Sequence, residues 1–177
     1  AFEVGGLPFP IAAVLTALPR PNQAFWTLSA LWSGWLWGSE ASAAIKSVLR
    51  RRRYDWDWHT EALHANLLHL GRMLDPGTPA LGLVSEAEPG FLSAALASAG
   101  RAGFALQGIA LRGDEGQAQI GWQRDPEKAS PAPEDGTPLT DFVRQAASEY
   151  LLRRGEPVGY LELHAAIVEI VVNEDAE

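Results

Sequence analysis

The chain has 177 residues, of which 47% are hydrophobic and none is cysteine. This length allows one domain with a packed core and a small appendage, and the absence of cysteine excludes disulfide bonds and thiolate metal sites. No apolar run reaches the roughly 18–20 residues that a membrane span requires. Because nothing at the start of the chain resembles a secretory signal, the default expectation is a cytoplasmic protein with no membrane segment. No bound metal is expected either, because His59, His64 and His69 are spaced five residues apart and do not share one face of a helix.

Negative charge is concentrated near the end of the chain. The net charge at pH 7 is −8, and residues 134–177 contribute −7 of it, from ten acidic residues against three arginines. Overall acidity disfavours broad nucleic-acid binding, although a local basic patch such as Arg50–Arg53 remains able to contact phosphate.

The first third of the chain predicts a strand and two helical segments. The apolar run "IAAVLTAL" at residues 11–18, closed by Pro19, is typical of a buried parallel strand. Residues 22–37 predict a helix that packs its apolar face and its tryptophans against the sheet. Five apolar residues share that face: Leu28, Leu31, Trp32, Trp35 and Leu36. Residues 40–53 predict a second helix or an ordered insertion.

The middle of the chain alternates between helical and strand patterns. Helical periodicity predicts helices over 58–73 and 88–103, and a short apolar run predicts a strand over 80–84. Residues 104–112 and 117–124 predict two strands joined by the turn "GDEG".

The end of the chain predicts a linker and a helical module. Residues 125–138 are rich in proline, alanine and acid, which is typical of a linker. Helices are expected over 139–153 and 161–172, separated by a Gly-Glu-Pro break. They resemble the first two helices of a winged-helix unit, but no recognition helix follows. The expected divisions are therefore 1–124, 125–138 and 139–177.

The element order predicts an α/β fold with a partial open sheet. Strands that alternate with helices indicate parallel pairing, while the tight turn between the last two strands requires an antiparallel hairpin. We expect half of an open sheet, flanked by helices, with an antiparallel strand at its edge and the small helical appendage after it.

Two segments resemble a known family. The stretch "TALPRPNQAFWTLSALWSGWLWG" is similar to the turn after the fourth strand, and the aromatic-rich helix behind it, in amino-methylating DNA methylases. The stretch "HLGRMLDPGTPALGLVSE" is similar to their next helix, turn and strand. The chain from Ile11 to Arg124 thus resembles the C-terminal half of a class I S-adenosylmethionine-dependent methyltransferase, in which a sixth and an antiparallel seventh strand follow.

The resemblance implies a base-amine site at the turn, from which this chain departs. In the family an acidic or amide side chain and a backbone carbonyl accept the N–H bonds of the target amine, while an aromatic residue stacks on the flipped base. Here Ala17 stands at the acidic position and Arg20 at the aromatic one, and only Pro19 matches. Asn22 is a nearby amide that offers a replacement.

The resemblance also implies a cofactor-binding half that this sequence lacks. Gly5-Gly6 opens no helix and fails the context of a nucleotide loop. We therefore expect no cofactor in this chain, no methyltransferase activity by the isolated chain, and S-adenosylmethionine only as the cofactor of an active full-length protein. A fragment or remnant of a DNA methyltransferase is one interpretation, and a non-catalytic protein- or nucleic-acid-interaction module is the alternative.

Further candidates for substrate binding carry aromatic, basic or acidic side chains. Tryptophans such as Trp26 and Trp56 could stack on bases, since Trp37, Trp56 and Trp58 lie off the main apolar face. The run Arg50, Arg51, Arg52 and Arg53 could contact DNA phosphates. Glu86 follows a strand at its carboxyl end, where open sheets bind ligands. Each has an ordinary alternative in core packing, a solvated helix end or a helix start. The exposed edge of a half-sheet favours self-association, so a homodimer is also expected.

Overall fold

The computed structural model describes residues 10–20, 23–40, 42, 55–128 and 139–174. Four strands form one sheet, β1 (Val14–Ala17), β2 (Pro79–Val84), β3 (Phe104–Arg112) and β4 (Gln117–Arg124). The helices are α1 (Gln23–Trp37), α3 (Trp56–Gly71), α4 (Pro89–Arg101), α5 (Leu139–Arg154) and α6 (Tyr160–Glu174), with a 3₁₀ turn at Pro126–Lys128. Most of the expected segment 40–53 and of the expected linker lies outside the described residues.

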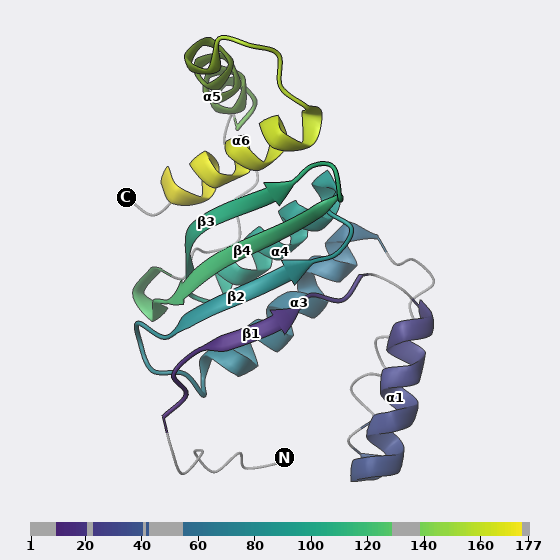
Figure 1. Cartoon of the computed structure of the whole chain (residues 1–177). Coiled ribbons are helices and arrows are strands. Elements are labelled where there is room, and N and C mark those ends of the chain that lie inside the picture. Colours follow the sequence, from purple (N-terminus) through teal and green to yellow (C-terminus); the bar gives the residue numbers. More distant parts are fainter. Residues whose placement is uncertain (1–9, 21–22, 41, 43–54, 129–138, 175–177) are drawn as a thin grey trace.

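The sheet is open and has the order β1-β2-β4-β3 (Figure 1). β1 pairs with β2 in parallel, with Val14 opposite Ala80, and β4 is antiparallel to both β2 and β3. The expected α/β class, parallel strands and terminal hairpin are confirmed. The expectation that the antiparallel strand lies at the edge is wrong, because β4 inserts between β2 and β3 and leaves β1 and β3 as the edges.

Gly82 allows the hairpin to pack closely against β2. A Cβ atom at this position would lie 2.5 Å from the ring of Trp122 on β4. The missing side chain therefore leaves the space that the buried indole fills, and Leu18 packs beside it.

One face of the sheet is covered and holds the core. Strand residues alternate between buried and exposed along β2 and β4, as a half-covered sheet requires. Helices α3 and α4 pack against each other beneath this face, and α6 packs against α4 and β3. The most deeply buried side chains of the core come from β2, α4, β3 and β4: Val84, Phe91, Leu92, Ala95, Leu96, Ala99, Phe104 and Ile120. The α6 helix adds Ala165 to the same core.

Arg124 lies at one end of this core and links the ends of α3 and α4 by donating hydrogen bonds to backbone carbonyls. Its guanidinium donates to Gly71 at the end of α3 over 3.0 Å and to Gly103 after α4 over 2.6 Å. Gly103 has φ +76°, a backbone conformation that favours glycine. A side chain at this position would also clash with the Arg124 guanidinium.

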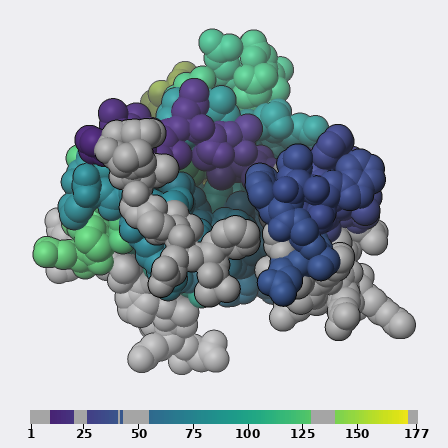
Figure 2. All heavy atoms as spheres, turned by 90° about the horizontal axis from the view of Figure 1, so that it is seen from below, coloured from purple at the N-terminus to yellow at the C-terminus, as the bar shows by residue number. Residues whose placement is uncertain are grey.

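No described helix covers the opposite face of the sheet, and α1 stands beside it (Figures 1 and 2). Leu15 on β1 is 70% exposed. The expectation that α1 packs its apolar face against the sheet is wrong for Trp32 and Trp35, which are 55% and 76% exposed. Trp37, which was expected off that face, is 64% exposed. Helical periodicity identifies an apolar face but not the direction in which that face points. Among the described helices, none is both long and apolar enough to cross a bilayer.

Candidate functional site

The predicted catalytic turn lies at the carboxyl end of β1, beside the end of β2. Strand pairing continues one residue past β1, since the Leu18 amide donates to the Leu83 carbonyl over 2.9 Å. Leu18 is buried and anchors the turn, whereas Pro19 and Arg20 are half-buried. Because β1 and β2 are parallel, the turn faces the segment that follows β2, at the edge where open α/β sheets bind ligands.

Arg20 joins this turn to the segment after β2 through two ion pairs. Its guanidinium contacts the carboxylate of Glu86 and donates to the carboxylate of Glu88. Two of the predicted site residues, Arg20 and Glu86, are therefore brought together. All three side chains keep more than a third of their surface exposed, so the network contributes modestly to stability.

The same ion pairs set the charge of the site. One guanidinium against two carboxylates leaves a net charge of −1 at this edge, which repels phosphate. Glu88 occupies the N-cap position of α4 without capping the helix by its side chain, because its carboxylate accepts from Arg20 instead.

Ala17 and Thr16 offer little to a base amine at this position. Ala17 is exposed on the open face and has only a methyl side chain, while Thr16 points to the covered side. The Thr16 hydroxyl has a long contact of 3.4 Å to the Ala17 carbonyl. The acceptors that the turn provides here are thus backbone carbonyls.

His59 lies near the Pro19 backbone of the turn, and Trp56 packs beside His59. Asp55 caps α3 by accepting from the Trp58 amide over 3.0 Å, which fixes the first turn of the helix. Trp56 then stacks on Phe91 of α4, with ring centroids 5.8 Å apart and an interplanar angle of 22°. Its indole also lies against Gly90, where an added Cβ would come within 2.3 Å of Nε1. At least part of the Trp56 ring is therefore engaged in packing.

His59 is fully buried among aromatic rings. Phe91 lies 5.5 Å from its ring centroid and Trp56 lies 5.8 Å from it. Neither ring nitrogen has a hydrogen-bond partner among the described residues. Burial lowers the pKa of His59 to about 4, and the nearby Pro19 backbone carbonyl partly opposes this. The imidazole is therefore neutral at pH 7 and lies close to the Pro19 carbonyl of the candidate turn.

The remaining predicted site residues are not brought into this geometry. Asn22 and Arg50–Arg53 lie outside the described residues, and of Trp26 only the backbone within α1 is described. Their roles stay predictions.

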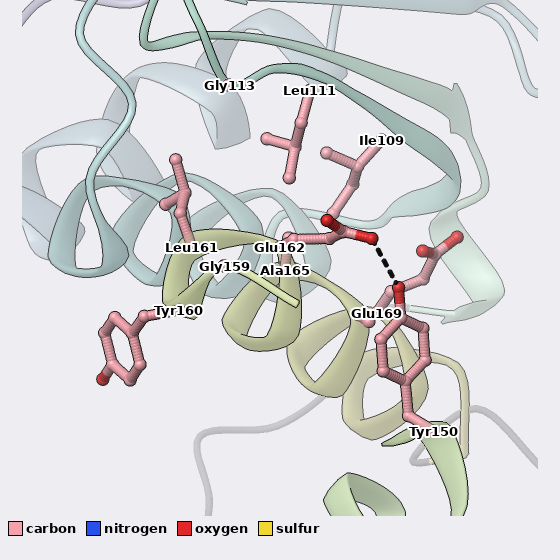
Figure 3. Close-up of a pocket in the computed structure, with 11 residues that line it drawn as sticks. Ile109, Leu111, Gly113, Tyr150, Gly159, Tyr160, Leu161, Glu162, Ala165 and Glu169 are labelled. Carbon is pink, nitrogen blue, oxygen red and sulfur yellow. Dashed lines mark hydrogen bonds between the residues drawn. The ribbon is translucent and has the colours of Figure 1, made fainter. Parts of the chain in front are cut away.

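A cavity lies between α5, α6 and the outer strand β3, away from the candidate turn (Figure 3). This cavity is partly open to solvent and has a volume of about 660 Å³. Ile109 and Leu111 form an apolar wall, while Glu162 and Glu169 bring carboxylates to it. The Tyr150 hydroxyl donates to Glu162 over 3.1 Å, and Glu162 also contacts Arg154 at 3.4 Å.

Burial raises the pKa of Tyr150, and the hydrogen bond and charge of Glu162 raise it further. The phenol therefore remains a neutral donor to Glu162. Sequence reasoning missed this pocket because it forms only when α6 packs on β3.

Comparison with protein-family models, curated protein sequences and solved structures gave no match. In the part of the chain that the structure describes, no three histidine or acidic side chains gather closely enough to hold a metal ion.

Sequence reasoning also missed the role of His59. The five-residue spacing of the three histidines of α3 places them on different faces of the helix. This spacing argues against a shared metal site but does not indicate which histidine is buried. The available signal was the position of His59 directly after Trp56 and Trp58, at the start of a predicted helix.

Proposed function

We propose that this chain is the target-recognition half of a methyltransferase-like fold directed at a base amine in DNA, and that the isolated chain does not transfer methyl groups. The observation that supports it most is the Pro19 turn at the carboxyl end of β1, adjacent to the parallel strand β2. The antiparallel β4, which follows a further strand, agrees with the strand pattern that the resemblance implies.

The chemistry of the turn accounts for the proposed inactivity. Methylation of an exocyclic amine needs acceptors that align its N–H bonds and stabilise the developing positive charge. In this chain the backbone carbonyls of the turn and the Asn22 amide would have to do so, because Ala17 has no acceptor. S-adenosylmethionine would supply the methyl group only in a full-length protein that holds a cofactor-binding half.

Recognition of the amine can be tested by deleting the amine from the DNA. A duplex with one unpaired adenine is compared with a duplex that carries unpaired purine, which lacks the exocyclic amine. We expect roughly tenfold tighter binding of the adenine duplex, the size of one hydrogen bond in a desolvated site, measured by fluorescence anisotropy. Adding S-adenosylmethionine should leave the affinity unchanged.

The matched variants for this assay are Asn22→Ala and Asn66→Ala. Asn66 lies on α3, where its exposed side chain donates to the Ala62 carbonyl, away from the turn. Asn22→Ala should remove the preference for adenine and Asn66→Ala should keep it. Equal affinity of the unsubstituted chain for the two duplexes contradicts the proposal.

The predicted phosphate contact of Arg50–Arg53 is tested separately. Replacing all four arginines by alanine should weaken binding to every DNA sequence. The association constant should also depend less steeply on salt, with the slope of its logarithm against the logarithm of the salt concentration smaller in magnitude by roughly 3–4. The control replaces Arg144, Arg153 and Arg154 of the acidic C-terminal module, and it should leave that slope unchanged. An unchanged slope in the first variant would exclude this contact.

A second candidate function is a non-catalytic protein-interaction module. It is favoured by the exposed apolar side chains of α1 and by the net charge of −1 at the candidate turn, where Arg20 is engaged by two carboxylates. Contiguous apolar surface of this kind marks protein–protein contacts.

A further inference from the structure

Helix α1 presents its apolar face to solvent. Five residues form what we call the α1 stripe, at the spacing i, i+3, i+4, i+7 and i+8: Leu28, Leu31, Trp32, Trp35 and Leu36. Their exposed fractions run from 50% to 76%. Within the stripe, Trp32 and Trp35 pack edge to face, with ring centroids 5.4 Å apart.

The side of α1 that is covered carries small residues instead. Ala30 is 5% exposed, and Gly34 lies against Ser42, whose Oγ would be 3.5 Å from an added Cβ. The helix has no extensive contact with another described helix or strand, and it stands at the margin of the molecule beside β1 (Figure 2). The large side chains therefore point away from the rest of the described chain.

We propose that the α1 stripe is the interface of a homodimer, in which α1 packs against α1 of a second copy about a twofold axis. This inference rests on the second of the two proposed functions and names its partner. The five residues of the stripe offer roughly 600–700 Å² of accessible surface. This lies in the lower part of the range of about 600–1,000 Å² per partner that stable protein–protein interfaces bury.

The charge of α1 favours a second copy as the occupant. An isologous interface places the same patch on both sides, so a charged patch would repel itself. No residue of α1 is charged, although the chain as a whole carries −8. Helices that lie on lipid carry lysine or arginine on their polar face, and α1 carries none.

The shape of α1 gives a second copy a place to insert side chains. Beside the stripe lies an apolar hollow of about 420 Å³, lined among others by Ala30, Gly34 and Trp35. Tryptophan anchors that enter such hollows dominate the binding energy of interfaces. The stripe thus supplies the projecting indoles, and the flank of α1 beside it supplies a hollow that can receive them.

Sedimentation velocity over a range of micromolar concentrations tests the homodimer. We expect the unsubstituted chain to be dimeric and Leu31→Ser/Trp35→Ser to be monomeric, with the dissociation constant raised by roughly a hundredfold or more. The matched control is Leu152→Ser, because Leu152 is 82% exposed on α5, outside the stripe, and this variant should remain dimeric. Tryptophan emission should shift to the blue as concentration rises, except in the double variant.

A charge exchange identifies the partner as α1 itself. Leu31 stands near the middle of the stripe, where the proposed twofold axis brings the two copies of one residue together. Leu31→Glu and Leu31→Lys should each be monomeric alone, whereas an equimolar mixture should form a heterodimer, since opposite charges then meet across the axis. A dimer that survives the double variant, or a mixture that stays monomeric, overturns the proposal. So does a monomeric unsubstituted chain. If that monomer also fails to bind an apolar dye such as ANS, the stripe is not exposed and the interaction-module function fails with it.

Discussion

Replacing Phe91 by alanine is expected to lower the free energy of unfolding by about 4 kcal/mol, because it leaves a cavity in a rigid core. Phe91 is 0% exposed and contacts both Trp56 and His59. Its ring holds the start of α3 against the start of α4. The measurement is urea unfolding at neutral pH, compared at unchanged m-value.

Leu152→Ala is the control for the Phe91 prediction. Leu152 is exposed on α5, so its truncation should change the free energy of unfolding by no more than about 0.5 kcal/mol. A loss below about 1 kcal/mol for Phe91→Ala would contradict the packing of α3 and α4 around this ring.

Acidification from about pH 6.5 to pH 4 is expected to lower the free energy of unfolding by about 3 kcal/mol through His59 alone. The sign follows from proton uptake. In the unfolded chain His59 binds a proton near its ordinary pKa of 6.5, whereas in the folded chain it stays neutral down to about pH 4. His59 therefore does not lower the free energy of unfolding above pH 6.5. It lowers this free energy progressively between the two pKa values and causes little further change below pH 4.

The variant His59→Leu isolates this contribution. Other histidines and the carboxylates titrate in both proteins, so the difference between the two pH profiles of unfolding free energy belongs to His59. That difference should change by about 3 kcal/mol across the interval. Two parallel profiles would show that the imidazole does not resist protonation in the folded state.

The sequence predicted the elements of the fold because their signals are local. The apolar run of 80–84 between a Pro-Gly turn and acidic residues indicated β2, and the periodicity of Phe91, Leu92, Ala95, Leu96 and Ala99 indicated the buried face of α4. The hairpin of β3 and β4 followed from its short turn. None of these inferences requires knowledge of distant contacts.

The position of β4 and the direction of α1 depend on contacts that are far apart in the sequence. β4 lies beside β2 because Trp122 fills the space above Gly82, a pair separated by 40 positions along the printed sequence. The α1 stripe has the spacing of a core-facing helix, and the structure nevertheless places it in solvent. Periodicity carries no information on which neighbour a face will meet.

The candidate site was predicted in part. Arg20 was predicted from the turn that follows β1, and Glu86 was predicted independently from the segment that follows β2. That they pair follows from the parallel register of β1 and β2, which no short motif encodes. His59 was missed since its burial requires the rings of two helices.

The sharing of one core by α6 and the sheet has a consequence for how this chain unfolds. Ala165 is buried among the same side chains as Phe104 and Ile120, and His164 contacts both the Ser93 hydroxyl and the Pro89 carbonyl at the start of α4. Local opening of α6 would expose part of this core to water. The C-terminal helix and the sheet therefore belong to one cooperative folding unit, despite the proline-rich segment that separates them in the sequence.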